Sequence, residues 1–171
     1  VWRNFEMTEN NFNLAEFHHS IYLHSHLSEV YYYIASSDGI CRWFMGKAEY
    51  MDSDGNILNA ADSARKDDTF NWHWLKKDLS IKGRVLEAIE NKLFSFTFGP
   101  AFEVTITIRE HEGRTLLTLH QKYSAGAEKN DFAHINCCAC WIFFLTNLKS
   151  VLEHGIDLRE TLIDDESLVN R

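Results

Sequence analysis

Two cysteines three positions apart are the most reactive-looking pair in this sequence. Cys137 and Cys140 form a C-x-x-C pair, a spacing that redox dithiols use. Such dithiols usually lie at the start of a helix that follows a strand, where the helix dipole lowers the pKa of a thiol. Here the pair falls a turn or more inside a predicted helix, and no strand directly precedes it. Because cysteine is also a common buried residue, packing in the core is the favoured interpretation.

A structural zinc site is a second chemistry that thiols can support. Cys41, Cys138 and His134 are the further candidate ligands. A structural zinc ion needs four converging ligands, and ligands that share one helix do not form a tetrahedron. The sequence therefore predicts no metal and no cofactor. Three of the four cysteines crowd one helix turn and no secretory leader is visible, so all four are expected to be thiols in a reducing cytoplasm.

The acid–base residues form no recognisable catalytic motif. The histidines are scattered, and His18-His19 and His24-Ser25-His26 flank the first predicted strand, where a surface position is expected. Two carboxylates lie on predicted strands: alternation places Glu103 outward and leaves the side of Glu87 open. No metalloprotease, hydrolase, phosphate-loop or dinucleotide motif is present. The sequence predicts no catalytic residue, and an enzyme is not the favoured class.

Length and charge limit the remaining classes. A chain of 171 residues is expected to form one domain. Its net charge of -8 argues against a nucleic-acid partner and against an anionic membrane surface. The longest unbroken apolar run, 137–145, is half of the roughly 18 residues that a membrane span needs. The heavy load of 12 Phe, 6 Tyr and 5 Trp indicates a large aromatic core or an aromatic pocket.

The predicted elements follow one another as a strand, two short helices, six strands and a long helix. Period-two alternation indicates the strands, and three-four spacing indicates the long helix. Ser28 and Asp131 are the expected N-caps, and Gly155 is the expected stop of the long helix. The strands are predicted at residues 17–24, 46–51, 69–74, 80–91, 93–98, 102–109 and 115–123. The helices are predicted at residues 29–35, 40–44 and 133–154.

Antiparallel strands in succession, with helices on one side, make an α+β layer architecture. We expect a seven-stranded curved antiparallel sheet wrapped around a long C-terminal helix, with two short helices after the first strand. The domain is predicted at residues 15–155. An N-terminal arm covers residues 1–14, and an acidic C-terminal tail covers residues 156–171.

The order of several short segments resembles a known family. It is similar to the helix-grip fold of the START-like and birch-pollen-allergen-like (SRPBCC) superfamily, and more narrowly to the activator of heat-shock-protein-90 ATPase homologue-like family. The resemblance covers about residues 15–155, although the linker 53–68 is long and the Cys137–Cys140 cluster is foreign to the pattern. The segments are Ser28-Glu29-Val30-Tyr31, Trp43-Phe44, Phe70-Asn71-Trp72-His73-Trp74, Gly83-Arg84-Val85-Leu86-Glu87, Glu112-Gly113-Arg114-Thr115-Leu116 and the helix end at 148–155.

The resemblance implies a hydrophobic cavity between the sheet and the long helix. It implies no particular reaction, because members serve lipid binding, transport, cyclisation and co-chaperone roles. The candidate lining consists of apolar residues expected to face this space. Equally, these side chains could simply fill the core. The candidates are Trp43, Trp72, Trp74, Phe94, Phe96, Phe98, Val104, Ile106, Leu117, Leu119, Trp141 and Leu145.

Three functions follow from this sequence. The favoured one is binding of a small hydrophobic or amphipathic ligand in the cavity. The alternative is a co-chaperone-like interaction module, supported by Asn71-Trp72-His73-Trp74, which resembles a segment from a different domain of eukaryotic activators of heat-shock protein 90. His73 should face away from its neighbouring tryptophans. The third is a cyclase- or hydrolase-like enzyme. A homodimer is compatible with all three, and a chaperone partner belongs to the second.

Overall fold

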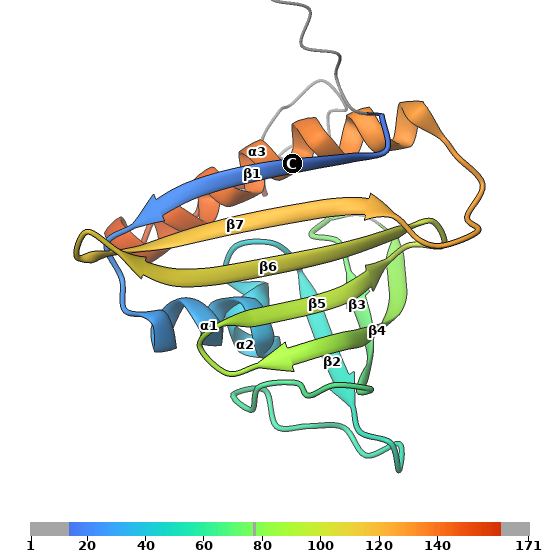
Figure 1. Cartoon of the computed structure of the whole chain (residues 1–171). Helices are drawn as coiled ribbons and strands as arrows, with labels where there is room; N and C mark the ends of the chain where they lie inside the picture. The colour runs from blue at the N-terminus through green and yellow to red at the C-terminus, as the bar shows by residue number, and fades with distance from the viewer. Residues whose placement is uncertain (1–13, 77, 162–171) are drawn as a thin grey trace, which may run out of the picture.

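The computed structural model describes residues 14–76 and 78–161 of the chain. These residues form a seven-stranded sheet in the order β1-β7-β6-β5-β4-β3-β2. Every neighbouring pair is antiparallel, and the long helix runs behind β1 (Figure 1). This confirms the predicted α+β architecture. The elements are β1 (Glu16–Leu23), α1 (Leu27–Ala35), α2 (Ser37–Cys41), β2 (Lys47–Met51), β3 (Thr69–His73), β4 (Ser80–Ile89), β5 (Leu93–Phe98), β6 (Phe102–His111), β7 (Arg114–Tyr123) and α3 (Asp131–His154).

Strand alternation gives the sheet two chemically different faces. On β6, Val104 and Ile106 are buried, whereas Glu103 and Thr105 lie on the other side and are only half-buried. The Glu103 carboxylate pairs with the Lys122 ammonium of β7 at 3.3 Å, which confirms its outward position. We call the side toward α3 the inner face and the opposite side the outer face.

Gly83 is a place where the sheet requires a residue without a side chain. It lies opposite Phe70 of β3 in the register. A Cβ at this position would lie 2.3 Å from the Phe70 ring, so the ring occupies the space of the missing side chain. The irregularity in the ladder falls slightly later in β4, between Val85 and Glu87.

The helix starts differ from the predicted ones. Asn130, and not Asp131, caps α3, because its side chain accepts a hydrogen bond from the Ala133 N–H at 2.9 Å. α1 begins at Leu27, and its N-cap His26 makes no side-chain capping bond, so Ser28 lies inside the first turn. Gly155 ends α3 in the left-handed conformation, as predicted.

α2 also begins earlier than the predicted 40–44. Ser36 accepts a hydrogen bond from the Gly39 N–H at 3.0 Å and donates to the Tyr32 carbonyl at 2.8 Å. The segment 36–39, which separates the two predicted helices, is therefore the capped start of α2. Serine and aspartate favour both turns and N-caps, so their presence alone does not separate the two.

α3 is held to the body of the protein by its inner side and its C-terminal end. Asn147 is buried; its amide donates to the Trp43 carbonyl at 2.8 Å and accepts from the Leu158 N–H at 2.7 Å. The Arg159 guanidinium donates to the Met45 carbonyl at 2.9 Å. Contacts with the domain thus continue past the predicted boundary at residue 155. Most of the predicted arm and the end of the predicted tail, residues 1–13 and 162–171, lie outside the described residues.

The outer side of α3 remains apolar. By length and composition alone, α3 could cross a membrane, and it is the one helix of which this holds within residues 14–76 and 78–161. The sequence prediction counted unbroken apolar residues and did not register this. Because Trp141, Leu145 and Leu148 of the same helix are buried, we interpret α3 as a core helix with an apolar outer stripe.

Candidate functional site

The predicted lining residues come together in one cluster between the inner face of the sheet, α3 and the segment after α2. Ten of the twelve are buried in the core, and Trp74 and Phe98 are half-buried against it. They reach this space from β3, β5, β6, β7 and α3, with Trp43 from the segment after α2. The inward orientation of the strand residues was therefore predictable from alternation, and that of Trp141 and Leu145 from helical spacing.

Phe44 is the centre of this aromatic cluster, and sequence reasoning did not single it out. Its ring lies 4.7 Å from Trp141 and 4.7 Å from Phe144, measured between centroids. It also contacts Trp74 and Phe98 at 6.0 and 6.2 Å. The only available signal was its position beside Trp43, since a residue in a connecting segment belongs to no periodic pattern. The rings around Phe44 are in contact, so space for a ligand depends on their movement.

The cluster reaches solvent where β3 and β5 end. Trp74 and Phe98 are half-buried, and their rings lie 6.2 Å apart. Phe98 also packs on Trp141 of α3 at 5.5 Å. Trp74 and Phe98 therefore form the partly exposed end of the aromatic interior, and Trp141 lies buried behind Phe98.

Two buried polar groups interrupt this apolar interior. Neither Tyr50 Oη nor Trp72 Nε1 makes a hydrogen bond of ordinary geometry with any residue that the structure describes. Burial raises the pKa of Tyr50 well above its usual value, and the nearby Trp72 indole N–H opposes only part of that rise. Tyr50 was not predicted as a site residue, although its alternation with Ala48 on β2 could have placed it inward.

Gln121 is a further polar side chain on the inner face. It continues the inward series of Leu117 and Leu119 along β7. Its carbonyl oxygen accepts a hydrogen bond from the Trp141 indole N–H at 2.9 Å. Its amide nitrogen is buried without a hydrogen-bond partner among the described residues. The same alternation that placed the two leucines inward could have identified it.

The cysteines behave as packing residues. All four are thiols, with no disulfide between them. Burial raises the pKa of the Cys137 thiol to about 11, and the nearby Gln121 side chain opposes this only in part. A thiol with such a pKa is protonated at neutral pH, which is the reverse of what a redox dithiol needs. Cys140, by contrast, is exposed.

His134 is the buried ionisable residue that an enzyme hypothesis would need. It is fully buried, and its ring contacts Phe17 at 5.0 Å, Phe102 at 5.8 Å and Tyr123 at 5.2 Å. The sequence considered it as a ligand beside the helix cysteines, but it packs among these aromatic rings. These contacts make His134 part of the aromatic packing between β1, β6, β7 and the start of α3.

The remaining polar candidates lie away from the interior. His73 Nε2 is 3.1 Å from Asn71 Nδ2, and both are half-buried on the face opposite Trp72. The side of Glu87, which the sequence left open, is settled by its pairing with Lys66 at 3.3 Å near the surface.

A hollow lies outside the predicted site. It has a volume of about 950 Å³ and is open to solvent. Apolar side chains contribute to its wall, and acidic groups outnumber basic ones around it. The sequence treated residues 53–68 only as a long linker, so this hollow was missed. It is lined by Tyr31, Asp52, Ser53, Leu58, Asp62, Ser63, Ala64, Arg65, Lys66, Asp67, Asp68, Ala88 and Glu90.

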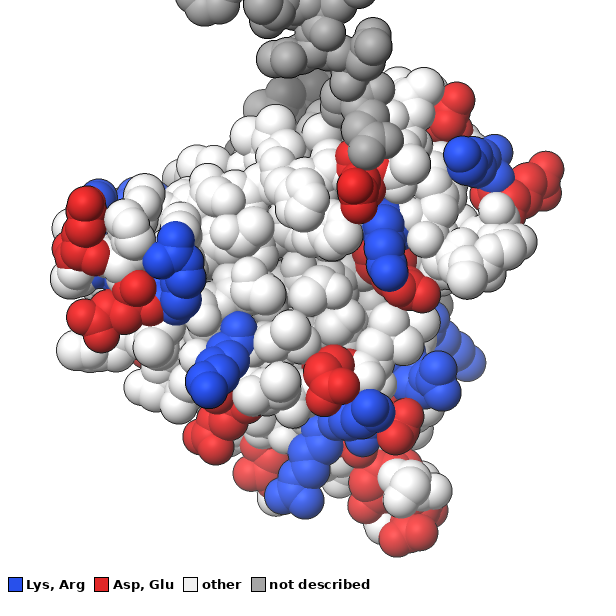
Figure 2. Space-filling model, in the orientation of Figure 1, with Lys and Arg blue, Asp and Glu red and all other residues white. Residues whose placement is uncertain are grey.

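The charges on the surface follow no single pattern. On the face shown in Figure 2, Lys and Arg alternate with Asp and Glu near the margins, and the middle of the face carries little charge. No continuous basic surface is visible on that face, as expected from the net charge of -8.

Comparisons with known proteins agree with this architecture. A family model described as Activator of Hsp90 ATPase homolog 1-like protein matches residues 25–153. The comparison with curated proteins gave no match. Among solved structures, protein SSP2350 from Staphylococcus saprophyticus is 17% identical with a TM-score of 0.66, and the match covers 84% of this chain and 96% of that one.

Two further solved structures are similar. The Aha1 dimer from Colwellia psychrerythraea is 20% identical with a TM-score of 0.62, and the match covers 82% of this chain and 97% of that one. DynU16, a putative protein in the dynemicin biosynthetic locus, is 14% identical with a TM-score of 0.56; the match covers 84% of this chain and 49% of DynU16. At these identities the likeness shows the shared fold.

Proposed function

Because this chain belongs to the Activator of Hsp90 ATPase homolog 1-like family of the START-like superfamily, we propose that it is a binding domain for a small hydrophobic or amphipathic ligand. The ligand would lie between the inner face of the sheet and α3. The family and the fold support a hydrophobic-ligand or co-chaperone-like module. The choice of a ligand rests on the interior itself.

The buried pair of Tyr50 Oη and Trp72 Nε1 carries this proposal. A buried polar group without a partner costs about 1–3 kcal/mol. A ligand with one carbonyl, hydroxyl or carboxyl oxygen would accept a hydrogen bond from each group and remove that cost. Such a ligand is amphipathic, with an apolar part among the rings and a polar atom at the pair.

Burial of the apolar part sets the scale of affinity. A ligand that loses about 200 Å² of apolar surface to water gains on the order of 5 kcal/mol before binding costs. Loss of rigid-body freedom and rearrangement of the rings around Phe44 remove much of this gain. The tightest binding that we expect is therefore micromolar, for a slender ligand that enters between Trp74 and Phe98.

Titration with fatty acids and with an uncharged hydrophobic probe tests the proposal, read from tryptophan fluorescence. Tyr50→Phe keeps the ring and removes the hydroxyl, so we expect about fivefold to tenfold weaker binding of the fatty acids and little change for the uncharged probe. Tyr33→Phe, which removes a hydroxyl from a half-buried ring at the rim of the core, is the matched control. Absence of binding to the native chain, or equal fatty-acid binding by both variants, contradicts the proposal.

A specific observation favours a second function, an interaction module that pairs with a second copy of this chain. The outer stripe of α3 exposes Phe132 by 82%, Ile135 by 51% and Ile142 by 56%. With Ala139 these residues follow the spacing of a helix–helix seam. In an antiparallel pair of helices that cross at Ala139, the small side chain permits close approach, and Ile135 of one copy meets Ile142 of the other.

A similar solved structure, from Colwellia psychrerythraea, is described as a dimer, which supports testing this partner first. Sedimentation of the native chain is expected to give a dimer, and Ile142→Glu a monomer, because a charge in the seam would be buried unpaired. Ile57→Glu is the control, since Ile57 is 65% exposed in the linker and outside the stripe. A native monomer at concentrations up to about 100 μM contradicts this function.

A chaperone partner at Asn71-Trp72-His73-Trp74 stays a prediction. Trp72 is buried, so a partner would meet mainly Asn71, His73 and the exposed part of Trp74. We also propose a reducing, cytoplasmic location, which the four thiols support.

A further inference from the structure

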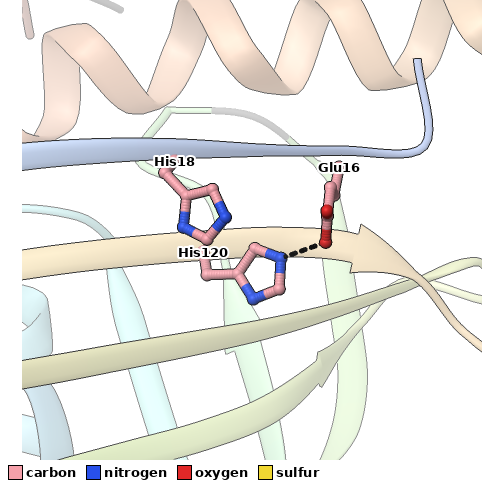
Figure 3. A group of neighbouring side chains, drawn as sticks. All are labelled: Glu16, His18 and His120. Carbon is pink, nitrogen blue, oxygen red and sulfur yellow. Dashed lines mark hydrogen bonds and ion pairs between the residues drawn. The ribbon is translucent and has the colours of Figure 1, made fainter. Parts of the chain in front are cut away.

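Two histidines and a glutamate meet on the outer face of the sheet, away from the ligand site proposed above. Glu16 and His18 lie on β1, and His120 lies directly opposite His18 in the register with β7. Phe17 and His19 of β1 contact α3, at His134 and at the Cys138 carbonyl, so alternation turns Glu16 and His18 to the other side. Figure 3 shows the three side chains gathered beside one another on this face.

The existing contacts bring ligand-type atoms close together. The His120 Nε2 atom lies 2.8 Å from a Glu16 carboxylate oxygen. The rings of His18 and His120 are stacked, with centroids 4.1 Å apart and an interplanar angle of 6°. One ligand atom from each of the three residues lies within 4.8 Å of the other two.

These distances are close to those of a metal site. Nitrogen and oxygen ligands at about 2.0–2.1 Å from a tetrahedral ion lie about 3.3 Å from one another. No separation therefore needs to shorten by more than about 1.5 Å. Side-chain rotation can supply this, because His18 is exposed and Glu16 and His120 are only half-buried at the edge strand and its neighbour.

Among the described residues, the lysine opposite Glu16 in the register directs its charge away from this cluster. Lys122 is the register partner of Glu16, but its ammonium pairs with Glu103 of β6 at 3.3 Å. The lysine charge is thereby directed to the next strand. The Glu16 carboxylate remains beside the two imidazoles and would offset part of the charge of the ion.

We propose that Glu16, His18 and His120 bind a divalent transition-metal ion of the Zn²⁺, Ni²⁺ or Cu²⁺ type. Two imidazoles and a carboxylate suit these borderline ions and do not suit Mg²⁺ or Ca²⁺, which take oxygen ligands. Three protein ligands leave at least one coordination position to water or to a small ligand.

Such an ion would join the edge strand β1 to β7. These strands are adjacent in the sheet but about a hundred residues apart in the chain, so the ion would close a long loop. β1 carries Phe17 and His19, which contact α3 from the inner face. The ion would therefore hold in place the strand against which the start of α3 rests.

Calorimetric titration of the metal-stripped chain with Zn²⁺ and with Ni²⁺ tests the proposal, with Mg²⁺ as the negative control. We expect one ion per chain and a higher melting temperature with Zn²⁺, because an ion that binds only the folded state stabilises it. His18→Ala should weaken binding at least about tenfold, as should His120→Ala and Glu16→Gln.

Two control variants distinguish this site from metal binding by other side chains of the protein. His26→Ala removes an exposed histidine outside the cluster, and Cys140→Ser removes an exposed thiol; both should bind as the native chain does. His18→Ala changes an exposed side chain, so it remains informative even if His120→Ala does not fold. Absence of binding to the native chain overturns the proposal, and so does binding that His18→Ala leaves unchanged. In either outcome the histidine stack and the His120–Glu16 contact serve only to pair the strands.

Discussion

The inner and outer faces of the same sheet differ in whether certain of their polar side chains have hydrogen-bond partners. On the outer face, polar side chains pair across strands: Ser20 Oγ and Thr118 Oγ1 are 2.9 Å apart, and Ser95 Oγ and Thr105 Oγ1 are also 2.9 Å apart. On the inner face, Tyr50 and Trp72 keep buried polar atoms without such partners. Water can replace the contact of Ser20 with Thr118, which is exposed, whereas the unpartnered inner groups cost free energy until something binds them.

Removal of one buried ring and of one exposed ring should give the largest difference in stability. Phe44→Ala deletes the ring that joins Trp141, Phe144 and Phe98, and we expect a loss of about 3–5 kcal/mol in the free energy of unfolding. Phe132→Ala deletes an exposed ring of α3, and within one copy of the chain the loss should stay within about 0.5 kcal/mol. Urea unfolding at low protein concentration measures both.

A similar loss in the two phenylalanine variants would contradict the comparison. If Phe132→Ala became costly only at higher protein concentration, the second copy proposed for the α3 stripe would explain the difference. A small effect of Phe44→Ala at every concentration would mean that the interior is loosely packed and already has space for a ligand.

The two thiols of the C-x-x-C pair allow buried and exposed positions to be compared by their rates of alkylation. Burial raises the pKa of Cys137 from 9.0 to about 11, which lowers its thiolate fraction at neutral pH about 100-fold. Cys140 is exposed. Alkylation followed by mass spectrometry should therefore modify Cys140 well before Cys137, and Cys140→Ser should remove the fast phase. Equal rates for the two thiols would place Cys137 in contact with solvent and weaken the packing interpretation.

The sequence predicted the parts of this molecule that depend on periodicity. Alternation located β6 and its inward Val104 and Ile106, and it oriented Glu103 outward. It could not identify Phe44, because a residue between elements takes its position from the elements that it joins. Cap positions were misplaced by one to a few residues because Ser, Asp and Asn suit both turns and helix starts.

The cluster on the outer face was beyond sequence reasoning for another reason. His18 and His120 looked like scattered histidines, since they are separated by about a hundred positions. Their contact depends on the pairing of β1 with β7 and on the register within that pair. A shift of one residue would turn His18 to the inner face, so alternation within each strand does not by itself predict the site.

The smallest expected effect concerns pH and the segment after α3, which lies at the boundary between interior and surface. Burial alone would raise the pKa of Asp157, but hydrogen bonds from Arg159 and Asn147 outweigh it and hold the pKa below its usual value. A carboxyl whose pKa is lower in the folded state stabilises that state fully above the unfolded-state pKa of about 3.9, and the contribution disappears as pH falls below it. Asp157→Asn should therefore be less stable than the native chain at pH 7, and the difference should shrink as pH falls below about 3.9 and through the folded-state pKa. Because the Asp157 side chain is 40% exposed, the difference should be a small part of the total stability.

Urea unfolding of the native chain and of Asp157→Asn at pH 7 and at pH 3 measures this difference. A difference of the same size at both pH values would assign the effect of the substitution to packing and not to the charge of Asp157.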